Sequence, residues 1–335
     1  MPGSAKRVTL QDIAQATGYT INTVSRALQN KPDIGRDTCL RIQQTAREMG
    51  YVRNYLASSL RSGRTKTLAM IVGSLSNPFY AILADLVQSE ALRLGYGLMI
   101  LSSRDDPDME VQAVEMALSR QVDGILMTPC SFDSPALFML HAAEIPVVLL
   151  SRYQKDRDDD YVVCNDERGG YLAGRHLIEH GHRRLAMLSL HHIVFSSSER
   201  FSGFLRACRE ADISVEDVPC AEPETETALR NCLRQWHEEG RTGLFCFCDM
   251  EAWRVTVLLD EMGISAPEGI SVIGFDNIQK YTDFSKPLCT IDPDLAEEAR
   301  TAIELLRNRI HDPSLPPQQV ILPVSLVCRG SCGNK

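Results

Sequence analysis

The stretch Val8-Thr-Leu-Gln-Asp-Ile-Ala-Gln-Ala-Thr-Gly-Tyr-Thr-Ile-Asn-Thr-Val-Ser-Arg-Ala-Leu28 decides the fold of the N-terminal part of the chain. Thr9, with Asp12 three residues later, is the pattern of a helix start in which side chains and backbone cap one another. Gly18 can adopt the left-handed conformation of a tight turn, and Thr20 can cap a second helix that runs to about Gln29. The stretch therefore predicts two short helices joined by a glycine turn, a helix-turn-helix.

The second predicted helix has an apolar face and a polar face. Val24, Ala27 and Leu28 fall on one side at spacings typical of a buried helix face. The opposite side carries residue types that pair with base edges, since Asn suits adenine, Arg suits guanine and Ile can meet a thymine methyl group. We expect DNA contacts from Thr20, Ile21, Asn22, Thr23, Ser25 and Arg26. A solvated polar face of an ordinary helix is the alternative that this pattern leaves open.

A third helix is predicted from Arg36 to Met49, with Leu40, Ile42 and Ala46 closing a three-helix core. Gly35 precedes it where a capping Ser or Thr would be stronger, so its start is expected to be weakly capped. Residues 54–60 are only weakly amphipathic and too few to form a stable helix alone. DNA is the obvious agent that could order them.

Charge is distributed unevenly along the chain. Residues 1–66 contain 11 Lys and Arg against 4 Asp and Glu, a net +7 that leaves −16 for the remainder of a chain whose total is −9. A basic end can approach phosphate while the acidic part is repelled by it.

The run from Val8 to Leu28, with Gly50-Tyr51 and residues 54–64, resembles the headpiece of the LacI family of transcription regulators. The resemblance implies that Ile21, Asn22 and Arg26 read the major groove of a palindromic double-stranded operator, and that 54–60 form a hinge helix on it. It adds Asn54, Ala57 and Leu60 as DNA contacts, with Leu60 wedged into the minor groove.

From Thr67 onward apolar strands alternate with helical stretches, which predicts parallel α/β sheets. The strands are expected at 68–72, 98–101, 124–127, 147–150, 162–164, 185–188, 244–247 and 271–275, with helices such as 80–94 and 251–262 between them. The polar segment from Arg152 to Asp160 is expected to cross between two lobes. Ligands of open α/β sheets bind at the carboxyl ends of the strands, so facing lobes predict a cleft.

The family resemblance continues over nearly the whole chain. It is carried by Ser76-Asn-Pro-Phe-Tyr80, Val122-Asp-Gly-Ile125, Gly181-His-Arg-Arg184, Arg200-Phe-Ser-Gly-Phe204, Gly274-Phe-Asp-Asn277 and Leu322-Pro-Val-Ser-Leu-Val-Cys-Arg329. It implies an all-α helix-turn-helix headpiece with a hinge helix, followed by an α/β two-lobed core like the periplasmic binding proteins, with three crossovers and dimerisation through the core.

The expected domains are the headpiece over 1–53, the hinge helix and linker over 54–66, and the ligand-binding and dimerisation core over 67–335. The first lobe is expected to comprise about 67–160 plus 291–318, and the second about 161–290 plus 319–335.

The resemblance also implies ligand contacts. Phe79 and Tyr80 would stack on one face of a sugar or a purine, and packing of helix against strand is the alternative that stays open. Arg200 can fork onto two hydroxyls or a carboxylate, and Asp276 can accept from two hydroxyls. Asp249 lies in the matching loop, but Cys248 replaces the usual Asn beside it, which leaves the ligand open. Further candidates are Arg152, Asp166 and Phe247.

These features predict a homodimeric, cytoplasmic, sequence-specific regulator, expected to be a repressor, whose operator affinity depends on a sugar-like effector. Alternatives are control by a partner protein and a pure small-molecule binding protein.

No phosphate-binding loop or nucleophile motif supports an enzyme. His176, His180 and His182 lack the further ligands of a zinc site, and the 11 cysteines are scattered without a CxxC pair, so no metal, cofactor or disulfide is expected. No apolar run is long enough for a membrane helix.

Overall fold

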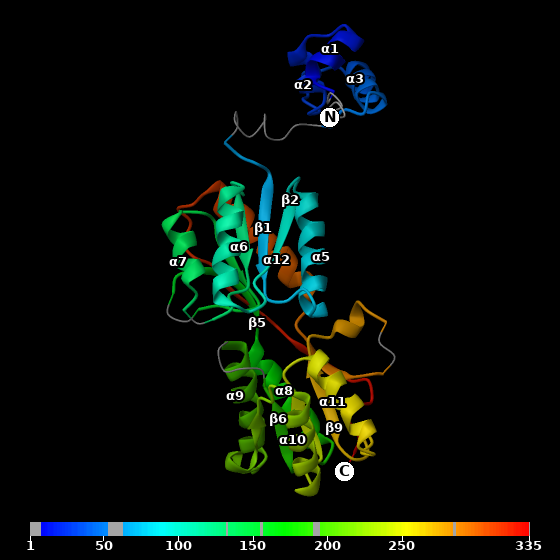
Figure 1. The fold of residues 1–335 in the computed structure, drawn as a ribbon, viewed down its shortest axis with the longest axis vertical. Coiled ribbons are helices and arrows are strands. Elements are labelled where there is room, and N and C mark those ends of the chain that lie inside the picture. Colours follow the sequence, from blue (N-terminus) through cyan, green and yellow to red (C-terminus); the bar gives the residue numbers. More distant parts are fainter. Residues whose placement is uncertain are drawn as a thin grey trace, which may run out of the picture. The chain divides into compact units, whose positions relative to one another are not determined.

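The computed structural model describes residues 8–52, 63–131, 133–154, 157–189, 195–283 and 286–334. The chain divides into two compact units, Met1–Gly63 and Arg64–Lys335. Figure 1 shows a helical N-terminal unit and a larger unit that contains two sheets. The expectations for Asn54, Ala57 and Leu60, and for a hinge helix over 54–60, lie outside the described residues.

Three helices form the headpiece: α1 (Leu10–Thr17), α2 (Ile21–Ala27) and α3 (Arg36–Glu48). The predicted reciprocal cap is present, since the Thr9 amide donates to the Asp12 carboxylate at 2.8 Å while the Thr9 hydroxyl accepts from the Asp12 amide at 3.3 Å. Gly18 ends α1 with φ 76°, the left-handed conformation that the turn requires. Gly35 begins α3 without a side-chain cap, as expected.

The headpiece core is formed by one face of each helix, with Ile13, Val24 and Ile42 fully buried. The expectation that Leu40 closes this core is wrong, because its side chain is 56% exposed. Leu40 is two residues from Ile42, about 200° around the helix, so the two cannot share a face. Cys39 packs against the core instead, one turn before Ile42.

The second unit contains two sheets, each with six strands among the described residues. The first, in the order β11-β5-β4-β3-β1-β2, is parallel throughout and comprises β1 (Thr67–Val72), β2 (Gly97–Ser102), β3 (Gly124–Met127), β4 (Val147–Leu150), β5 (Asp160–Cys164) and β11 (Gln319–Leu322). The second sheet has the order β12-β10-β9-β8-β6-β7. Its strands are parallel except β12, which pairs antiparallel with β10. They are β6 (Leu185–Leu188), β7 (Cys220–Ala221), β8 (Gly243–Cys246), β9 (Ser271–Phe275), β10 (Cys289–Asp292) and β12 (Ser325–Val327).

Helices cover both faces of each sheet, which buries the almost continuous apolar strands (Figure 1). On the first sheet, α5 (Pro78–Arg93) and α12 (Leu295–His311) cover one face, and α6 (Pro107–Ser119) and α7 (Pro135–Ala142) the other. On the second, α8 (Asp166–Glu179) and α9 (Phe195–Glu210) lie opposite α10 (Glu226–Glu238) and α11 (Asp249–Glu261). Short 3-10 helices span Val215–Asp217 (η1) and Ile278–Lys280 (η2).

The chain passes between the lobes at three places: after β5, after β10 and after β11. The expected crossover from Arg152 to Asp160 is wrong, because this segment joins the neighbouring strands β4 and β5 of one sheet. The lobe limits shift accordingly, with 161–164 and 319–322 in the first lobe and 291–292 in the second. A short polar segment resembles a crossover, but which sheet a strand joins depends on a partner far away in sequence.

Among the described helices, none combines the length and apolar composition that a membrane crossing requires.

Candidate functional site

A cavity of about 120 Å³ lies where the two sheets present the carboxyl ends of their strands to each other. From the first lobe it is lined by Ser74, Asn77, Phe79, Tyr80, Asp105, Ser151 and Arg152, and from the second by Ser196, Arg200, Phe247, Cys248 and Asp276. Strand order reverses between β1 and β3 and between β6 and β8, the point at which open α/β sheets bind ligands. Six of the eight predicted ligand residues line this cavity, and Asp166 and Asp249 do not.

Larger hollows exist in the second lobe, but they are lined by other residues. One of about 540 Å³ is lined by Arg183, Arg184 and Arg241, next to the amino ends of β6 and β8. Because ligands of such sheets bind at the carboxyl ends of strands, we take the smaller cavity as the candidate site.

The start of α5 positions the two aromatic residues. The Asn77 side chain accepts from the Phe79 amide at 3.1 Å, and Pro78 occupies the first helical turn, so the motif fixes where this helix begins. The rings of Phe79 and Tyr80 meet edge to face, with centroids 5.1 Å apart and planes at 80°. Only one of them can therefore lie flat against a planar ligand. Burial raises the pKa of Tyr80 to about 12, so its hydroxyl remains a donor at neutral pH.

Close packing of α8 on α9 positions Arg200. A Cβ on Gly170 would lie 1.8 Å from the Arg200 carbonyl oxygen, and one on Gly203 would lie 1.8 Å from the Glu167 carbonyl oxygen. The two helices therefore approach backbone to backbone, which larger residues would prevent. This brings Arg200 against Asp166, with Arg200 Nε 2.6 Å from Asp166 Oδ1.

Arg200 is the central charge of the cavity. It is 6% exposed, donates through Nη1 to the Phe247 carbonyl at 2.6 Å, and places its guanidinium 3.4 Å from the centre of the Phe275 ring. Its Nη1 is 4.0 Å from Asp276 Oδ1, an attraction without a hydrogen bond. Burial opposes the charge, but Asp166 and Asp276 more than offset this and raise the pKa of Arg200.

Asp276 has unused hydrogen-bonding capacity. Within the described part of the chain, no hydrogen bond ties its carboxylate, although the residue is 5% exposed. Burial raises the pKa of Asp276 well above its usual range, against the opposing effect of Arg200. A ligand that donates to this carboxylate would relieve the cost of its burial.

Arg152 forms the opposite, first-lobe wall. Its Nη1 donates to Asp105 Oδ1 at 2.7 Å and to the Pro129 carbonyl at 3.2 Å. Three non-glycine residues that line the cavity have left-handed backbones: Asp105 (φ 57°), Ser151 (φ 57°) and Asp276 (φ 106°). Such conformations are costly and gather at binding sites, where the surrounding structure holds them.

Asp249 does not line the cavity. It is fully buried at the start of α11, where its carboxylate accepts from the Thr290 hydroxyl at 2.5 Å and from the Ile278 amide at 3.0 Å. Its carboxylate therefore hydrogen-bonds to β10 and η2 and links them to α11, and it does not face the cavity as expected. The sequence could not show whether Asp249 contacts a ligand or hydrogen-bonds within the lobe, because the side chain of the first residue of a helix can point toward the cavity or into the protein.

The site also contains residues that the sequence analysis did not select: Ser74, Asn77, Asp105, Ser151 and Ser196. All of them follow the carboxyl end of a strand. A list of the polar residues after every predicted strand would have included them.

Buried carboxyls next to the cavity predict that the folded core loses stability as pH rises. Burial raises the pKa of both Asp249 and Glu298 to about 7, although Arg200 faces both and Arg329 also faces Asp249. The unfolded chain loses these protons near pH 4, so between about pH 4 and 7 each carboxyl costs up to about 1.4 kcal/mol per pH unit. We expect a lower free energy of unfolding at pH 8 than at pH 5.5, measured by urea denaturation of the full chain.

Asp249→Asn should remove one of these contributions, because an amide has the same shape and does not ionise. The control is Asp312→Asn, since hydrogen bonding to Ser314 lowers the pKa of Asp312 and confines its effect to more acid pH. A pH dependence between pH 5.5 and 8 that is identical in Asp249→Asn and the parent would contradict this assignment.

In the headpiece, the predicted DNA-contacting side chains lie along α2 and its start. Ile21 is 48% exposed and Asn22 is also exposed, so both can meet a base. Thr20 caps the helix by accepting from the Thr23 amide, and Ser25 accepts from Gln29 at 3.3 Å. Arg26 pairs with Asp33 at 2.6 Å. To reach a guanine, its guanidinium must exchange this partner for the base.

A helix-turn-helix unit joined to a two-lobed α/β core defines a transcription regulator with a periplasmic-binding-protein-like body. The model of bacterial regulatory proteins of the lacI family matches residues 9–54, and that of the periplasmic binding protein-like domain matches 175–332. The repressor PurR of Aliivibrio fischeri strain MJ11 is 30% identical over 98% of this chain and 99% of its own length. The PurR of Vibrio vulnificus strain CMCP6 is 32% identical over 91% of this chain and 92% of its own.

The chain belongs to the LacI family. It is a DNA-binding repressor with an effector-binding core, not an enzyme. Among solved structures, the lac repressor dimer bound to operator and the anti-inducer ONPF has a TM-score of 0.82 at 22% identity, covering 97% of this chain and 99% of the other. A LacI-family regulator from Enterococcus faecium with bound ribose has a TM-score of 0.71 at 25% identity, covering 80% and 99%.

Proposed function

We propose that a compact polyhydroxylated molecule, a sugar or sugar derivative, binds in the cavity between the lobes and controls the affinity of this repressor for its operator. The observation that carries the proposal is the pairing of Arg200 with Asp276 beside Phe79, Tyr80 and Phe247. A sugar ring presents hydroxyl groups around its edge and C–H groups on its faces. Charged hydrogen-bonding groups suit the edge, and an aromatic ring suits a face.

The chemistry of the lining favours a ligand rich in donors. Asp276 can accept from hydroxyl groups, and so can the carboxylate of Asp105, whereas Arg200 and Arg152 donate through their guanidinium groups. The volume of about 120 Å³ is below the roughly 300–1,000 Å³ of sites for drug-sized molecules. A single small ring is therefore favoured over an extended ligand.

Two relatives of known structure support a sugar. The Enterococcus faecium regulator holds ribose, and a periplasmic binding protein/LacI regulator from Alkaliphilus metalliredigens holds D-xylulofuranose at 25% identity to this chain. Both ligands are small polyhydroxylated rings, which is the class that the cavity's size and lining favour.

Control of the operator follows from how the segment next to the headpiece is anchored. The Thr65 amide donates to Asp123 Oδ1 at 2.7 Å and the Lys66 amide to Asp123 Oδ2 at 3.1 Å, which ties this segment to the start of β3 in the first lobe. A ligand that prefers one arrangement of the lobes shifts the population toward it. In a homodimer this would change the separation of the two linkers, and so the fit of two headpieces to a palindrome.

A thermal-shift screen of the full chain tests the ligand class. The panel contains monosaccharides, sugar phosphates, nucleobases and nucleosides. A ligand at 100 times its dissociation constant should stabilise the core by about 2.7 kcal/mol, enough to raise the melting temperature by several degrees. Stabilisation by a sugar alone would support the proposal, whereas stabilisation by a nucleobase and by no sugar would overturn the ligand class.

Asn22→Ala is expected to weaken binding to the cognate operator by about 1–3 kcal/mol and to relax the preference at one base pair. The physical reason is the loss of a bidentate contact with an adenine. Fluorescence anisotropy with the operator and with single-base variants, at one fixed salt concentration, measures both effects. Gln44→Ala, an exposed amide on α3, is the matched control. Equal losses in both variants would contradict a base-reading role for Asn22.

A further inference from the structure

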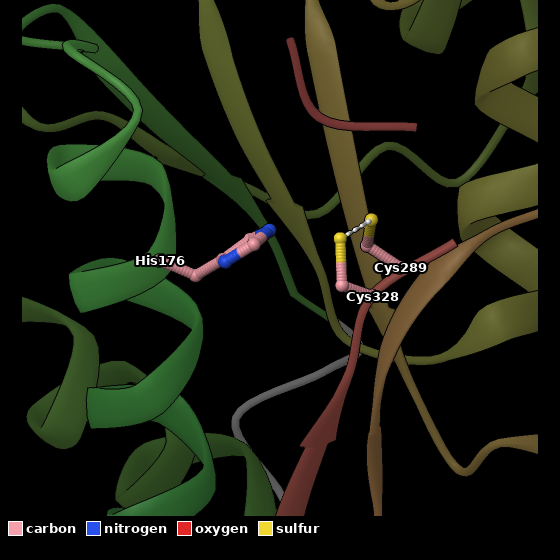
Figure 2. A group of neighbouring side chains, drawn as sticks. All are labelled: His176, Cys289 and Cys328. Atoms are coloured by element: carbon pink, nitrogen blue, oxygen red, sulfur yellow. Dashed lines mark hydrogen bonds between the residues drawn. The ribbon is translucent and has the colours of Figure 1, made fainter. Parts of the chain in front are cut away.

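Two cysteines and a histidine converge in the second lobe, and none of them lines the effector cavity. His176 comes from α8, Cys289 from β10, and Cys328 directly follows β12. Their potential ligand atoms all lie within 4.8 Å of one another. Figure 2 shows the imidazole of His176 pointing toward the two sulfur atoms.

The antiparallel pairing of β10 with β12 creates this arrangement. Thr290 lies opposite Val327 and Ile291 opposite Leu326, so the next pair outward is Cys289 with Cys328. Their sulfur atoms are 3.7 Å apart. Helix α8 packs on the same side, against the core that contains Cys289 and Ile291. Segments from three distant parts of the sequence thereby place soft ligand atoms together.

The buried histidine distinguishes this group from ordinary core cysteines. A buried thiol often fills space as a small apolar side chain and needs no partner. His176, however, is 6% exposed, and its Nε2 has no hydrogen-bond partner among the described residues. An unpaired buried ring nitrogen is costly. A ligand atom of His176 and the two sulfur atoms lie within 4.8 Å of one another, so one bound cation could contact all three residues.

The geometry fits a tetrahedral cation. Zinc–sulfur bonds of about 2.3 Å at a tetrahedral angle place two sulfur ligands about 3.8 Å apart, close to the 3.7 Å between Cys289 and Cys328. A tetrahedral site with a zinc–nitrogen bond of about 2.0 Å places nitrogen about 3.5 Å from each sulfur. The separations here are up to 4.8 Å, so they must shorten by up to about 1.3 Å. Cys328 is exposed, which gives a cation a route of entry, whereas Cys289 and His176 are buried.

A backbone amide also points at the sulfur atom of Cys289. The Arg329 amide donates to Cys289 Sγ at 3.3 Å. Thiolate is the form of cysteine that binds metals.

We propose that His176, Cys289 and Cys328 form a binding site for one soft divalent cation, Zn²⁺, with the fourth tetrahedral position left to water. A cation there would link α8 to β10 and to the segment after β12. The chain enters the second lobe at α8, leaves it after β10 and re-enters it at β12, the strand just before Cys328. Bound Zn²⁺ would therefore stabilise this lobe, by an amount set by its concentration and dissociation constant.

The test uses the full chain, reduced and stripped of metal with a chelator. Titration with Co²⁺ should produce sulfur-to-cobalt charge-transfer absorption and the visible bands of a tetrahedral site at one equivalent, and Zn²⁺ should abolish them. Cys328→Ser should weaken Zn²⁺ binding on the order of 100-fold or more, since loss of an outer-shell group alone costs about 10–100-fold. His176→Gln should weaken it as well.

Two controls separate this site from general thiol chemistry. Cys232→Ser, which removes a partly exposed thiol of the same lobe on α10, should leave the Zn²⁺ affinity unchanged. Cys328 is exposed, so Cys328→Ser should unfold at the parent's temperature when no metal is present. Unchanged Zn²⁺ affinity in Cys328→Ser, equal loss in Cys232→Ser, or a reduced chain that forms a Cys289–Cys328 disulfide in air but takes up no Zn²⁺ would overturn the proposal.

Discussion

Arg200→Ala is expected to abolish the response to effector and to lower the free energy of unfolding of the core by about 3–5 kcal/mol. Arg200 is the cation that faces both Asp166 and Asp276, and all three side chains are less than 10% exposed. Its removal leaves buried carboxyls without a counter-charge, a larger penalty than the net value of the ion pairs themselves. The loss should be greatest at high pH, where those carboxyls cannot take up protons at low cost.

Arg206→Ala is the matched control for this prediction. Arg206 lies on the same helix and pairs with Glu167 at 3.2 Å, but its side chain is 42% exposed. Exposed pairs contribute about 0–1 kcal/mol, so this variant should remain close to the parent in stability and in effector response. Urea denaturation and ligand titration of both variants decide the matter. Comparable losses in the two, or an intact effector response in Arg200→Ala, would remove Arg200 from its proposed role.

Ile42→Ala is expected to unfold the headpiece and to eliminate operator binding while effector binding survives. Ile42 is fully buried where α3 meets the other two helices, and truncation of such a side chain costs about 2–5 kcal/mol. A unit of this size buries too little surface to be more than marginally stable, so a loss of that order is decisive. The core is a separate compact unit with its own apolar clusters and should retain its melting transition.

Leu40→Ala provides the comparison, because it removes a similar number of atoms from the same helix at a side chain that is 56% exposed. Operator affinity, measured by anisotropy, should change by less than a factor of about 3, as expected for a surface substitution within ±0.5 kcal/mol. Circular dichroism of the headpiece in each variant shows whether it is folded. A folded Ile42→Ala headpiece with normal operator affinity would contradict the predicted packing.

Local signals in the sequence predicted much of the fold. The Thr9 cap, the Gly18 turn and the Thr20 cap depend on neighbours within four residues, and all three are confirmed. Apolar runs such as 124–127, 147–150 and 185–188 predicted strands with their observed limits, because a strand buried on both faces has no polar interruption. The candidate site could be predicted to the extent that its residues follow the ends of such strands.

Features that depend on distant partners could not be predicted in this way. The strand β11 pairs with β5, 158 residues earlier, so nothing local shows which lobe it joins. Asp249 turns toward Thr290, and Cys289 lies opposite Cys328, for reasons that only the sheet register reveals. The sequence spacing groups His176 with His180 and His182, whereas its ring points toward Cys289 on β10 and Cys328 just after β12 (Figure 2).

The central claim is that a ligand in the cavity between the lobes controls operator binding, and the most direct measurement is operator affinity of the full chain as a function of effector concentration at fixed salt. We predict that a sugar which stabilises the core changes operator affinity by a constant factor at saturation. Operator DNA should change the affinity for that sugar by the same factor, because the two equilibria are linked. An operator affinity that stays constant while the sugar saturates the core would contradict the account.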